Sequence, residues 1–389
     1  MTDPAGRHAD RLLTLETLPF FIGGFLGPFG TMVVISIYPE LRESFDASTG
    51  AVNWSFSGYM FAMAGLLLVS GTIGERFGRK RVTRVTFLVY AATALMAAVA
   101  PNLATFLGAR ILMGGANAFI TPLLLAGLSE VIDERRFGRA VGVYSAFQAA
   151  GSAVSPFASG LIAEVDWRWT FVLVAVVSTA LSFRPAPGEP RPASDAPPIR
   201  PLFRLPMIRL WLAAFAAAAG PIGLAVLVGI RLRDQLDVSS SAAGTVLLVS
   251  GLITMATSPR WGGLIDRLGG RRSSLLAGGG AVAAASVLGL FDGVVSFVLA
   301  WLLAASVLGF LAVNLQRLAA LAVPENRGGA LSSVLSFRFV GHASGPLLFV
   351  PLLDRSAATA FAVAASLGIV TIAVFVLAER DTAAPDISS

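Results

Sequence analysis

The chain contains no cysteine among its 389 residues, and it has only two histidines, His8 and His342. The lack of cysteine excludes disulfide bonds, thiolate metal sites and iron–sulfur clusters. Two histidines cannot form a zinc site by themselves, so the sequence predicts no metal site. Charged residues are scarce too: they make up 13% of the chain, about half of the roughly 25% found in soluble domains.

Apolar sequence takes the place of the missing charge. Hydrophobic residues make up 55% of the chain, and the mean hydropathy is +0.76. A helix of about 20 apolar residues spans the hydrocarbon core of a bilayer, whereas an open sheet would leave backbone groups unpaired in lipid. The sequence therefore predicts an all-α integral membrane protein with twelve transmembrane helices, at residues 17–39, 52–73, 82–100, 103–128, 139–163, 167–183, 207–230, 241–261, 274–291, 293–316, 330–353 and 357–378.

The basic residues are distributed unevenly between the segments that connect these spans. If the N-terminus is cytoplasmic, the cytoplasmic segments hold 22 Arg and Lys residues and the outer segments hold 5. Positive charge accumulates on the cytoplasmic side of membrane proteins, so both termini are expected in the cytoplasm. This topology accounts for the pI of about 10.6 without nucleic acid as a partner. The preference for arginine over lysine favours a GC-rich bacterial source, and hence the bacterial inner membrane.

No signal-peptide pattern precedes the first span, so we expect the first helix to remain in the mature protein. A stretch rich in proline and charge, "RPAPGEPRPASDAPPIRP" at residues 184–201, is typical of an extended, solvated connection. It leaves six spans on each side. The predicted organisation is a six-helix bundle at residues 1–184, a cytoplasmic linker at 185–206 and a second six-helix bundle at 207–389.

Two unrelated patterns recur along the chain. "GTIGERFGRKR" from residue 71 aligns with "GGLIDRLGGRR" from residue 262, which brings Glu75 onto Asp266 at an offset of 191. "GSAVSP" from residue 151 aligns with "GHASGP" from residue 341 at an offset of 190. The agreement predicts that the six-helix unit is duplicated in one orientation, as in the halves of many carriers. The two bundles should therefore be pseudo-symmetric.

The first pattern resembles the loop signature of the major facilitator superfamily, Gly-x-Leu-Ala-Asp-Arg-x-Gly-Arg-Arg. Ile73, Gly74 and Glu75 depart from it, and Glu75 keeps the acidic charge. The resemblance extends over essentially the whole chain and is to twelve-helix members that include bacterial drug:proton antiporters. It implies the major facilitator fold and cytoplasmic gating loops; the alternative is charge that only sets topology. The residues assigned to these loops are Gly71, Glu75, Arg76, Gly78, Arg79 and Lys80 in the first copy, and Asp266, Arg267, Gly269 and Arg271 in the second.

Arg110 lies about seven residues into the fourth span, and Asn117 lies on the same helical face. A charge at membrane depth costs at least roughly 2.5–3.5 kcal/mol, so such a residue usually faces a cavity and serves function. The segment resembles the Arg-x-x-Gln-Gly motif that the family associates with proton coupling, with Met113 in place of the glutamine. Arg110 and Asn117 are therefore candidates for substrate binding or proton coupling. The alternative is an arginine that extends outwards to the interface.

The fifth span resembles the motif associated with exporters in this family. Gly142, Gly151, Pro156 and Gly160 keep its register, while serine replaces two of its glycines. Small residues let helices pack closely, and proline removes one backbone hydrogen bond. The resemblance favours export over import.

Arg338 and His342 lie one helical turn apart near the middle of the eleventh span, and the repeat pairs them with Gln148 and Ser152. We expect all four side chains to line a central cavity as candidates for substrate or proton binding. Acidic residues are found only near the ends of the spans. Because unpaired positive charge repels cations strongly at low dielectric, a permanent organic cation should be disfavoured as a substrate.

The resulting prediction is a secondary active transporter that works by alternating access. Proton-coupled efflux of small amphipathic compounds is the leading function. The alternatives are import of a small organic solute and a non-transporting membrane sensor with the same fold. The sequence shows no nucleophile–base pair or phosphate loop, so we expect no enzyme activity and no cofactor. The expected partners are a small-molecule substrate, protons and the lipid bilayer, and the protein is expected to be a monomer.

Overall fold

The computed structural model describes residues 13–188, 200–323 and 327–383 of the chain. All regular secondary structure within these residues is helical. Each of the twelve predicted spans contains a helix, which confirms the predicted all-α membrane fold. Most of the predicted linker, residues 189–199, lies outside the described residues, as do the two chain ends.

The first half of the chain contains six long helices and one short one. The short helix, α3 (Tyr38–Phe45), follows the first span. The long helices are α2 (Leu18–Met32), α4 (Thr49–Phe77), α5 (Arg79–Ala98), α6 (Leu103–Val131), α7 (Glu134–Ala163) and α8 (Arg168–Ser182).

The second half begins with a short 3-10 turn, η2 (Arg200–Phe203), and its first span is interrupted. That span consists of α9 (Leu205–Ala219), the 3-10 turn η3 (Pro221–Leu224), α10 (Ala225–Ile230) and the π-helical turn η4 (Arg231–Gln235). The remaining helices are α11 (Ser240–Leu268), α12 (Gly270–Leu288), α13 (Val294–Ala322), α14 (Arg327–Leu353) and α15 (Ala357–Ala383).

Length and apolar composition support a membrane location for these helices. Seven of the described helical segments are long and apolar enough to cross a membrane, and α2 and α8 are shorter apolar helices. Charged first turns lower the apolar character of α5 and α12, which begin with "RKR" and "GRR".

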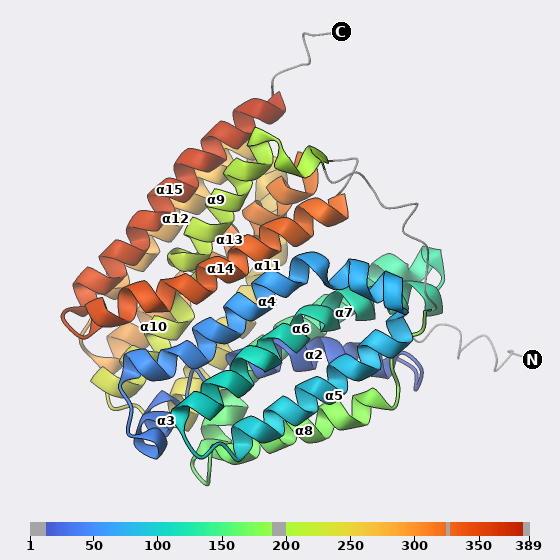
Figure 1. Cartoon of the computed structure of the whole chain (residues 1–389). Coiled ribbons are helices and arrows are strands. Elements are labelled where there is room, and N and C mark those ends of the chain that lie inside the picture. The colour runs from blue at the N-terminus through green and yellow to red at the C-terminus, as the bar shows by residue number, and fades with distance from the viewer. Residues whose placement is uncertain (1–12, 189–199, 324–326, 384–389) are drawn as a thin grey trace, which may run out of the picture.

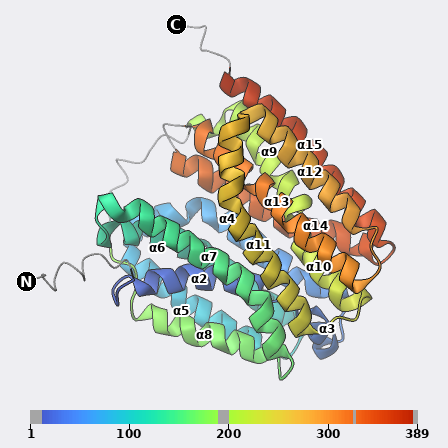
Figure 2. The ribbon, with the colours of Figure 1, turned by 180° about the vertical axis from the view of Figure 1, so that it is seen from behind.

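The two halves form separate groups of helices that meet along two helix pairs (Figure 1). Helix α4 of the first half packs against α14 of the second, and α7 packs against α11, as the rear view shows (Figure 2). The halves lie close together at the end that carries α3 and η4, which we call the α3 end. They diverge towards the opposite end, which carries the breaks at Gly78 and Gly269 and which we call the linker end.

Equivalent helix contacts confirm that the two halves repeat one packing arrangement. A Cβ atom on Gly151 of α7 would lie 2.2 Å from the Phe25 carbonyl oxygen of α2, and one on Gly341 of α14 would lie 2.4 Å from the Phe215 carbonyl oxygen of α9. Both partners are separated by the same 190 residues that relate the glycines. A second equivalent pair consists of Ser155 with Phe29 and Gly345 with Ala219.

The predicted gating loops are not loops. Gly71, Glu75 and Arg76 belong to the last turns of α4, and α5 begins directly after Gly78. In the second copy α11 continues to Leu268, and α12 begins after Gly269. Single glycines with φ of 84° and 76° make both reversals, because glycine adopts positive φ without steric cost. The helices extend further than expected since the charged residues continue the helical turns into water.

Two predicted spans are also discontinuous. The predicted span 17–39 ends as α2 at Met32, and turns lead into the separate helix α3. The predicted span 207–230 breaks at Gly220, since Pro221 has no N–H with which to continue the backbone ladder. In the apolar phase such irregular backbone is tolerated where it is buried in protein or lines a cavity.

The glycine contacts lead to a test with a control on the same helix. Gly151→Ala should destabilise the protein by about 1–3 kcal/mol, because its Cβ would collide with the Phe25 carbonyl. Gly142→Ala should be neutral or stabilising, since nothing lies within 4 Å of its Cβ and alanine favours helix by about 1 kcal/mol. Thermal unfolding of the purified protein in detergent measures both. Equal midpoints for the two variants would contradict the tight α2–α7 packing.

Candidate functional site

Arg110 is completely buried inside the first half and is held by backbone oxygens. Its Nη1 donates to the Gly30 carbonyl (2.7 Å), its Nη2 to the Thr31 carbonyl (3.2 Å) and its Nε to the Ser55 carbonyl (3.1 Å). The guanidinium also lies over the Tyr59 ring, 4.3 Å from its centroid. Two of these carbonyls lie in the last turn of α2, where a helix has no further N–H groups to offer. Arg110 therefore satisfies the end of α2 within the apolar interior.

Asn117 extends the same contact by two turns of α6. Its Nδ2 donates to the Gly27 carbonyl and to the Thr31 hydroxyl, each at 3.2 Å. Only 2% of Asn117 is exposed. The structure thus brings together Arg110 and Asn117, the two predicted site residues of the fourth span, on the face of α6 that packs against α2.

The motif in α7 divides between two neighbours. Gly151 faces α2, whereas Pro156 and Gly160 face α11 of the other half. A Cβ on Gly160 would lie 2.3 Å from the Ser240 carbonyl oxygen, and one on Gly244 would lie 2.3 Å from the Pro156 carbonyl oxygen. Each helix therefore places a glycine against the backbone of the other, which is the closest approach that two helices can make. Gly142, the first residue of the motif, has open space around it.

Gln148 and Arg338 occupy equivalent positions, but their surroundings differ. The Nε2 atom of Gln148 donates to the Thr121 hydroxyl of α6 at 3.0 Å. Arg338 is partly exposed, and its buried Nε has no hydrogen-bond partner among the described residues. His342 lies one turn further along α14, and its Nδ1 is 3.5 Å from the position of a Cβ on Gly223. Ser152 is partly buried on α7.

At the linker end, Arg79 is the centre of a charge cluster within the first half. Its side chain is 2% exposed and pairs with Glu75 of α4 at 3.1 Å and with Glu130 of α6. This cluster joins the ends of α4, α5 and α6. Arg76 and Lys80 are exposed beside it.

The second copy of the signature is built differently. Asp266, Arg267 and Gly269 are exposed, as is Arg271. Within the described part of the chain, no ion pair links Asp266 or Arg271 to another residue. The two copies thus share their helix reversal but not their charge contacts.

At the α3 end, two ion pairs join the halves, and sequence reasoning missed both. Arg42 of α3 pairs with Asp234 of η4 at 2.8 Å and also donates to Thr49. Arg233 of η4 pairs with Glu40 of α3. Along the chain the acidic residue comes before the basic one on α3, whereas the basic residue comes before the acidic one on η4. The sequence signal was present in two short outer segments of opposite charge order, but nothing local indicated that they meet.

The two segments that form these ion pairs, α3 and η4, are each anchored within their own half. An aromatic cluster of Phe45, Phe106, Trp167 and Phe171, with ring centroids 5.3–5.9 Å apart, holds α3 against α6 and α8. In the second half, the buried Arg231 of η4 bonds the Phe291 carbonyl and the Asp292 carboxylate, both in the connection before α13. The ion pairs therefore connect two rigid frames.

The ion pairs at the α3 end carry an electrostatic cost. Burial raises the pKa of Glu40 above its ordinary value, and the Arg233 guanidinium lowers it only in part. One oxygen of each carboxylate, Oε2 of Glu40 and Oδ1 of Asp234, is buried without a hydrogen-bond partner among the described residues. Desolvation can exceed the attraction within a buried ion pair. Desolvation therefore offsets part of the attraction within these ion pairs.

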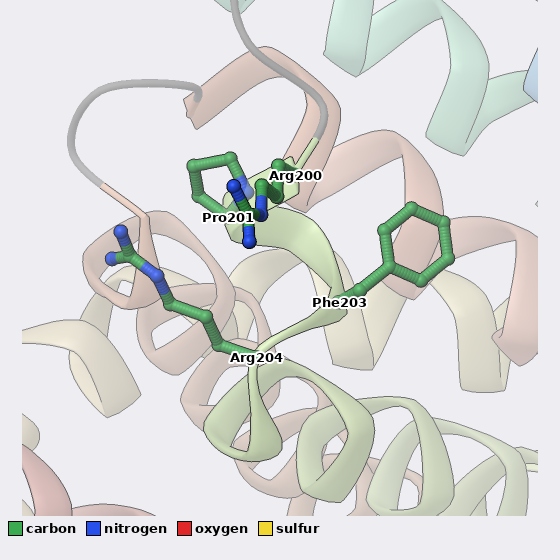
Figure 3. Close-up of a pocket in the computed structure, with 4 residues that line it drawn as sticks. All are labelled: Arg200, Pro201, Phe203 and Arg204. Carbon is green, nitrogen blue, oxygen red and sulfur yellow. The ribbon is translucent and has the colours of Figure 1, made fainter.

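A pocket of about 590 Å³ lies at η2, lined by Arg200, Pro201, Phe203 and Arg204 (Figure 3). The Phe203 ring points away from the two arginines (Figure 3). None of the predicted site residues is among the described residues that line the pocket.

Two pseudo-symmetric six-helix halves, joined at one end by ion pairs and glycine contacts, define a polytopic membrane protein of the carrier type. The model of the Major Facilitator Superfamily matches residues 20–224 and 210–388. The chain belongs to the major facilitator superfamily.

Relatives of known name match parts of the chain. The puromycin resistance protein pur8 of Streptomyces alboniger is 34% identical over 151 residues, which cover 38% of this chain and 30% of that protein. A multidrug resistance protein B homolog of Mycobacterium tuberculosis is 31% identical over 155 residues, covering 37% of this chain and 29% of that protein. In both cases the match spans less than a third of the relative's length.

Solved structures share the fold over nearly the whole chain. A bacterial homolog of the human lysosomal transporter Spinster, in an inward-facing and unoccupied conformation, has a TM-score of 0.74 at 14% identity, covering 98% of both chains. The xylose transporter XylE from E. coli has a TM-score of 0.69 at 12% identity, covering 95% of this chain and 99% of that one.

The contacts of Arg110 predict that its shape matters as well as its charge. Arg110→Lys keeps the charge but cannot donate to three carbonyls in different directions. It should lower the stability of the protein by at least about 2 kcal/mol and reduce transport. Arg168→Lys is the matched control, because Arg168 is partly exposed and pairs with Asp166 only at 3.7 Å. Thermal unfolding and transport in proteoliposomes are the measurements. An Arg110→Lys protein with unchanged stability and transport would show that donation to the three carbonyls is not required.

The ion pairs predict a charge-swap effect at the α3 end. Arg42→Asp should favour separation of the halves by roughly 1 kcal/mol, about fivefold in population, and adding Asp234→Arg should restore closure. Nitroxide labels on Gly50→Cys and Thr245→Cys report the distance between α4 and α11. Arg168→Asp, at the same end but paired within its own half, should leave the distances unchanged. Failure of the double variant to recover would argue against a direct pair.

Proposed function

We propose that the protein is a secondary active transporter that works by alternating access and exports small amphipathic compounds in exchange for protons. The observation that carries this proposal is the asymmetric joining of the halves. Ion pairs and glycine contacts hold them at the α3 end, while the helices diverge towards the linker end (Figure 1). Rocking of two repeats about a central site is how such carriers expose a substrate to each side in turn.

The basic residues give the proposed orientation. Arg79, Lys80 and Arg81 begin α5, and Arg271 and Arg272 begin α12, all at the linker end. Since positive charge favours the cytoplasmic side, the linker end is the cytoplasmic side of a bacterial inner membrane, with both chain termini there. The described conformation is then closed to the outside. The α4–α5 and α11–α12 reversals act as cytoplasmic gating elements.

Efflux is supported by two independent features. Two relatives that match part of the chain are named for resistance to puromycin and to multiple drugs. The α7 motif resembles that of exporters, and its glycines form the contact with α11. Substrate and protons are proposed to bind along α6, α7 and α14, at Arg110, Asn117, Gln148, Ser152, Arg338 and His342. The proposed molecule is a monomer of two bundles, residues 1–184 and 207–389, without cofactor or enzyme activity.

Whole cells test the direction of transport. In a bacterial host that lacks its own pumps, production of the protein should lower the accumulation of an amphipathic fluorescent dye. A protonophore should restore accumulation by removing the proton gradient. Faster dye uptake would show an importer, and unchanged accumulation across a panel of drugs and dyes would favour a sensor.

The absence of cysteine from the chain allows a conformational control. Glu40→Cys with Arg233→Cys, joined by a short thiol-cleavable bifunctional reagent, should hold the α3 end closed and stop efflux. Reduction of the reagent should restore it. The unmodified protein has no thiol and should be unaffected by the same treatment. Continued efflux by the cross-linked protein would contradict alternating access through this end.

A further inference from the structure

Arg338 differs from the other arginines inside the helical bundles. Arg79 has two carboxylate partners, Arg110 has three carbonyl partners and Arg231 has the Asp292 carboxylate. Arg338 lies in the middle of α14, and within the described residues neither a hydrogen bond nor an ion pair engages it. An unpaired charge at this depth is costly, so such a residue normally serves a ligand or a partner.

Comparison of the two halves shows why Arg338 has no partner of the kind that its equivalent, Gln148, has. In the first half Gln148 of α7 bonds the hydroxyl of Thr121. The helices α6 and α13 are related by 191 residues, as their starts at Leu103 and Val294 show. Ala312 therefore occupies the position of Thr121 in the second half, and it has no polar side-chain atom to accept from Arg338. A satisfied pair in one half is replaced by an unsatisfied cation in the other.

The backbone beside His342, one helical turn further along α14, is irregular. Helix α9 ends at Ala219, and the 3-10 turn Pro221–Leu224 follows. His342 of α14 approaches this turn, with Nδ1 3.5 Å from the position of a Cβ on Gly223. In carriers, discontinuous helices near the middle of the membrane commonly form substrate sites. The equivalent break after α2 is already filled by Arg110, whereas Trp301 takes the place of that arginine in α13.

The acidic residues of the described helices do not offset this charge. Glu75 and Glu130 are bound to Arg79, Glu40 to Arg233, and Asp234 to Arg42. The other acidic residues of the described chain lie near helix ends. At low dielectric, an unpaired cation favours an anion over a cation of the same size.

We propose that Arg338, one turn of α14 away from the break in the first span of the second half, binds an anionic group of the transported compound, such as a carboxylate. The substrate class is then small amphipathic anions, and organic cations are excluded. This inference rests on the proposed transport function for its physiological meaning. The rest of the compound is apolar, because the spans around Arg338 are apolar.

Binding to the purified full-length protein in nanodiscs tests the proposal without transport. The probes are naphthyl compounds of equal length that end in a carboxylate, a hydroxyl or a trimethylammonium group. The carboxylate should bind at least about tenfold more tightly than the trimethylammonium compound, since one charge-assisted hydrogen bond is gained. Equal affinity for the two, or a preference for the cation, overturns the proposal.

Three variants assign the preference to one residue. Arg338→Gln, which introduces the side chain of the equivalent Gln148, should lose the preference for the carboxylate while keeping the affinity for the hydroxyl compound. Arg338→Lys keeps the charge and should retain most of the preference. Arg355→Gln removes one exposed charge beyond the end of α14 and should change nothing. A preference retained in Arg338→Gln would overturn the assignment.

The comparison within the unmodified protein does not depend on the folding of any variant. It also separates this inference from the proposed efflux. Anion-selective binding without dye efflux would leave the site intact and contradict the transport function. Efflux by a protein that prefers cations would support the transport function and overturn the anion site.

Discussion

The structure depends on one constraint: in a lipid environment every backbone carbonyl must find a donor within the protein. Unbroken helices meet this constraint by themselves, but the chain interrupts its helices after Met32 and after Ala219. At the first interruption Arg110 and Asn117 supply the donors from α6. A buried arginine is costly on its own, and here the released carbonyls compensate for it. The break and the charge stabilise each other, so the sequence must keep both or neither.

The twelve helices could be predicted from the sequence because a long apolar run has few alternatives. The duplication was also predictable, since two unrelated patterns share one offset. The helix breaks were harder to locate. Pro28 remains inside α2, whereas Pro221 follows Gly220 at a true interruption, because surrounding helices decide whether a proline only bends a helix.

The side-chain partners of the site could not be predicted from sequence. The sequence placed Arg110 at membrane depth, but only the packing shows that its donors are directed to α2 and α4. The ion pairs between α3 and η4 join residues about 190 positions apart, and each segment alone reads as a solvated turn. Such contacts depend on the relative position of the two halves, which no local pattern encodes. Likewise, Arg79 was visible as part of a signature, whereas its contact with Glu130 was not.

The ion pairs and the glycine contacts at the α3 end differ in the range of separations over which they can form. The charged pairs have long, flexible side chains and can form over a range of separations. The reciprocal contacts of Gly160 and Gly244 cannot, because each brings one backbone directly against the other. They set how closely α7 and α11 approach each other at this end, whereas the ion pairs tolerate a range of separations. The geometry of the α3 end is thus fixed by residues without side chains, among them Gly160 and Gly244.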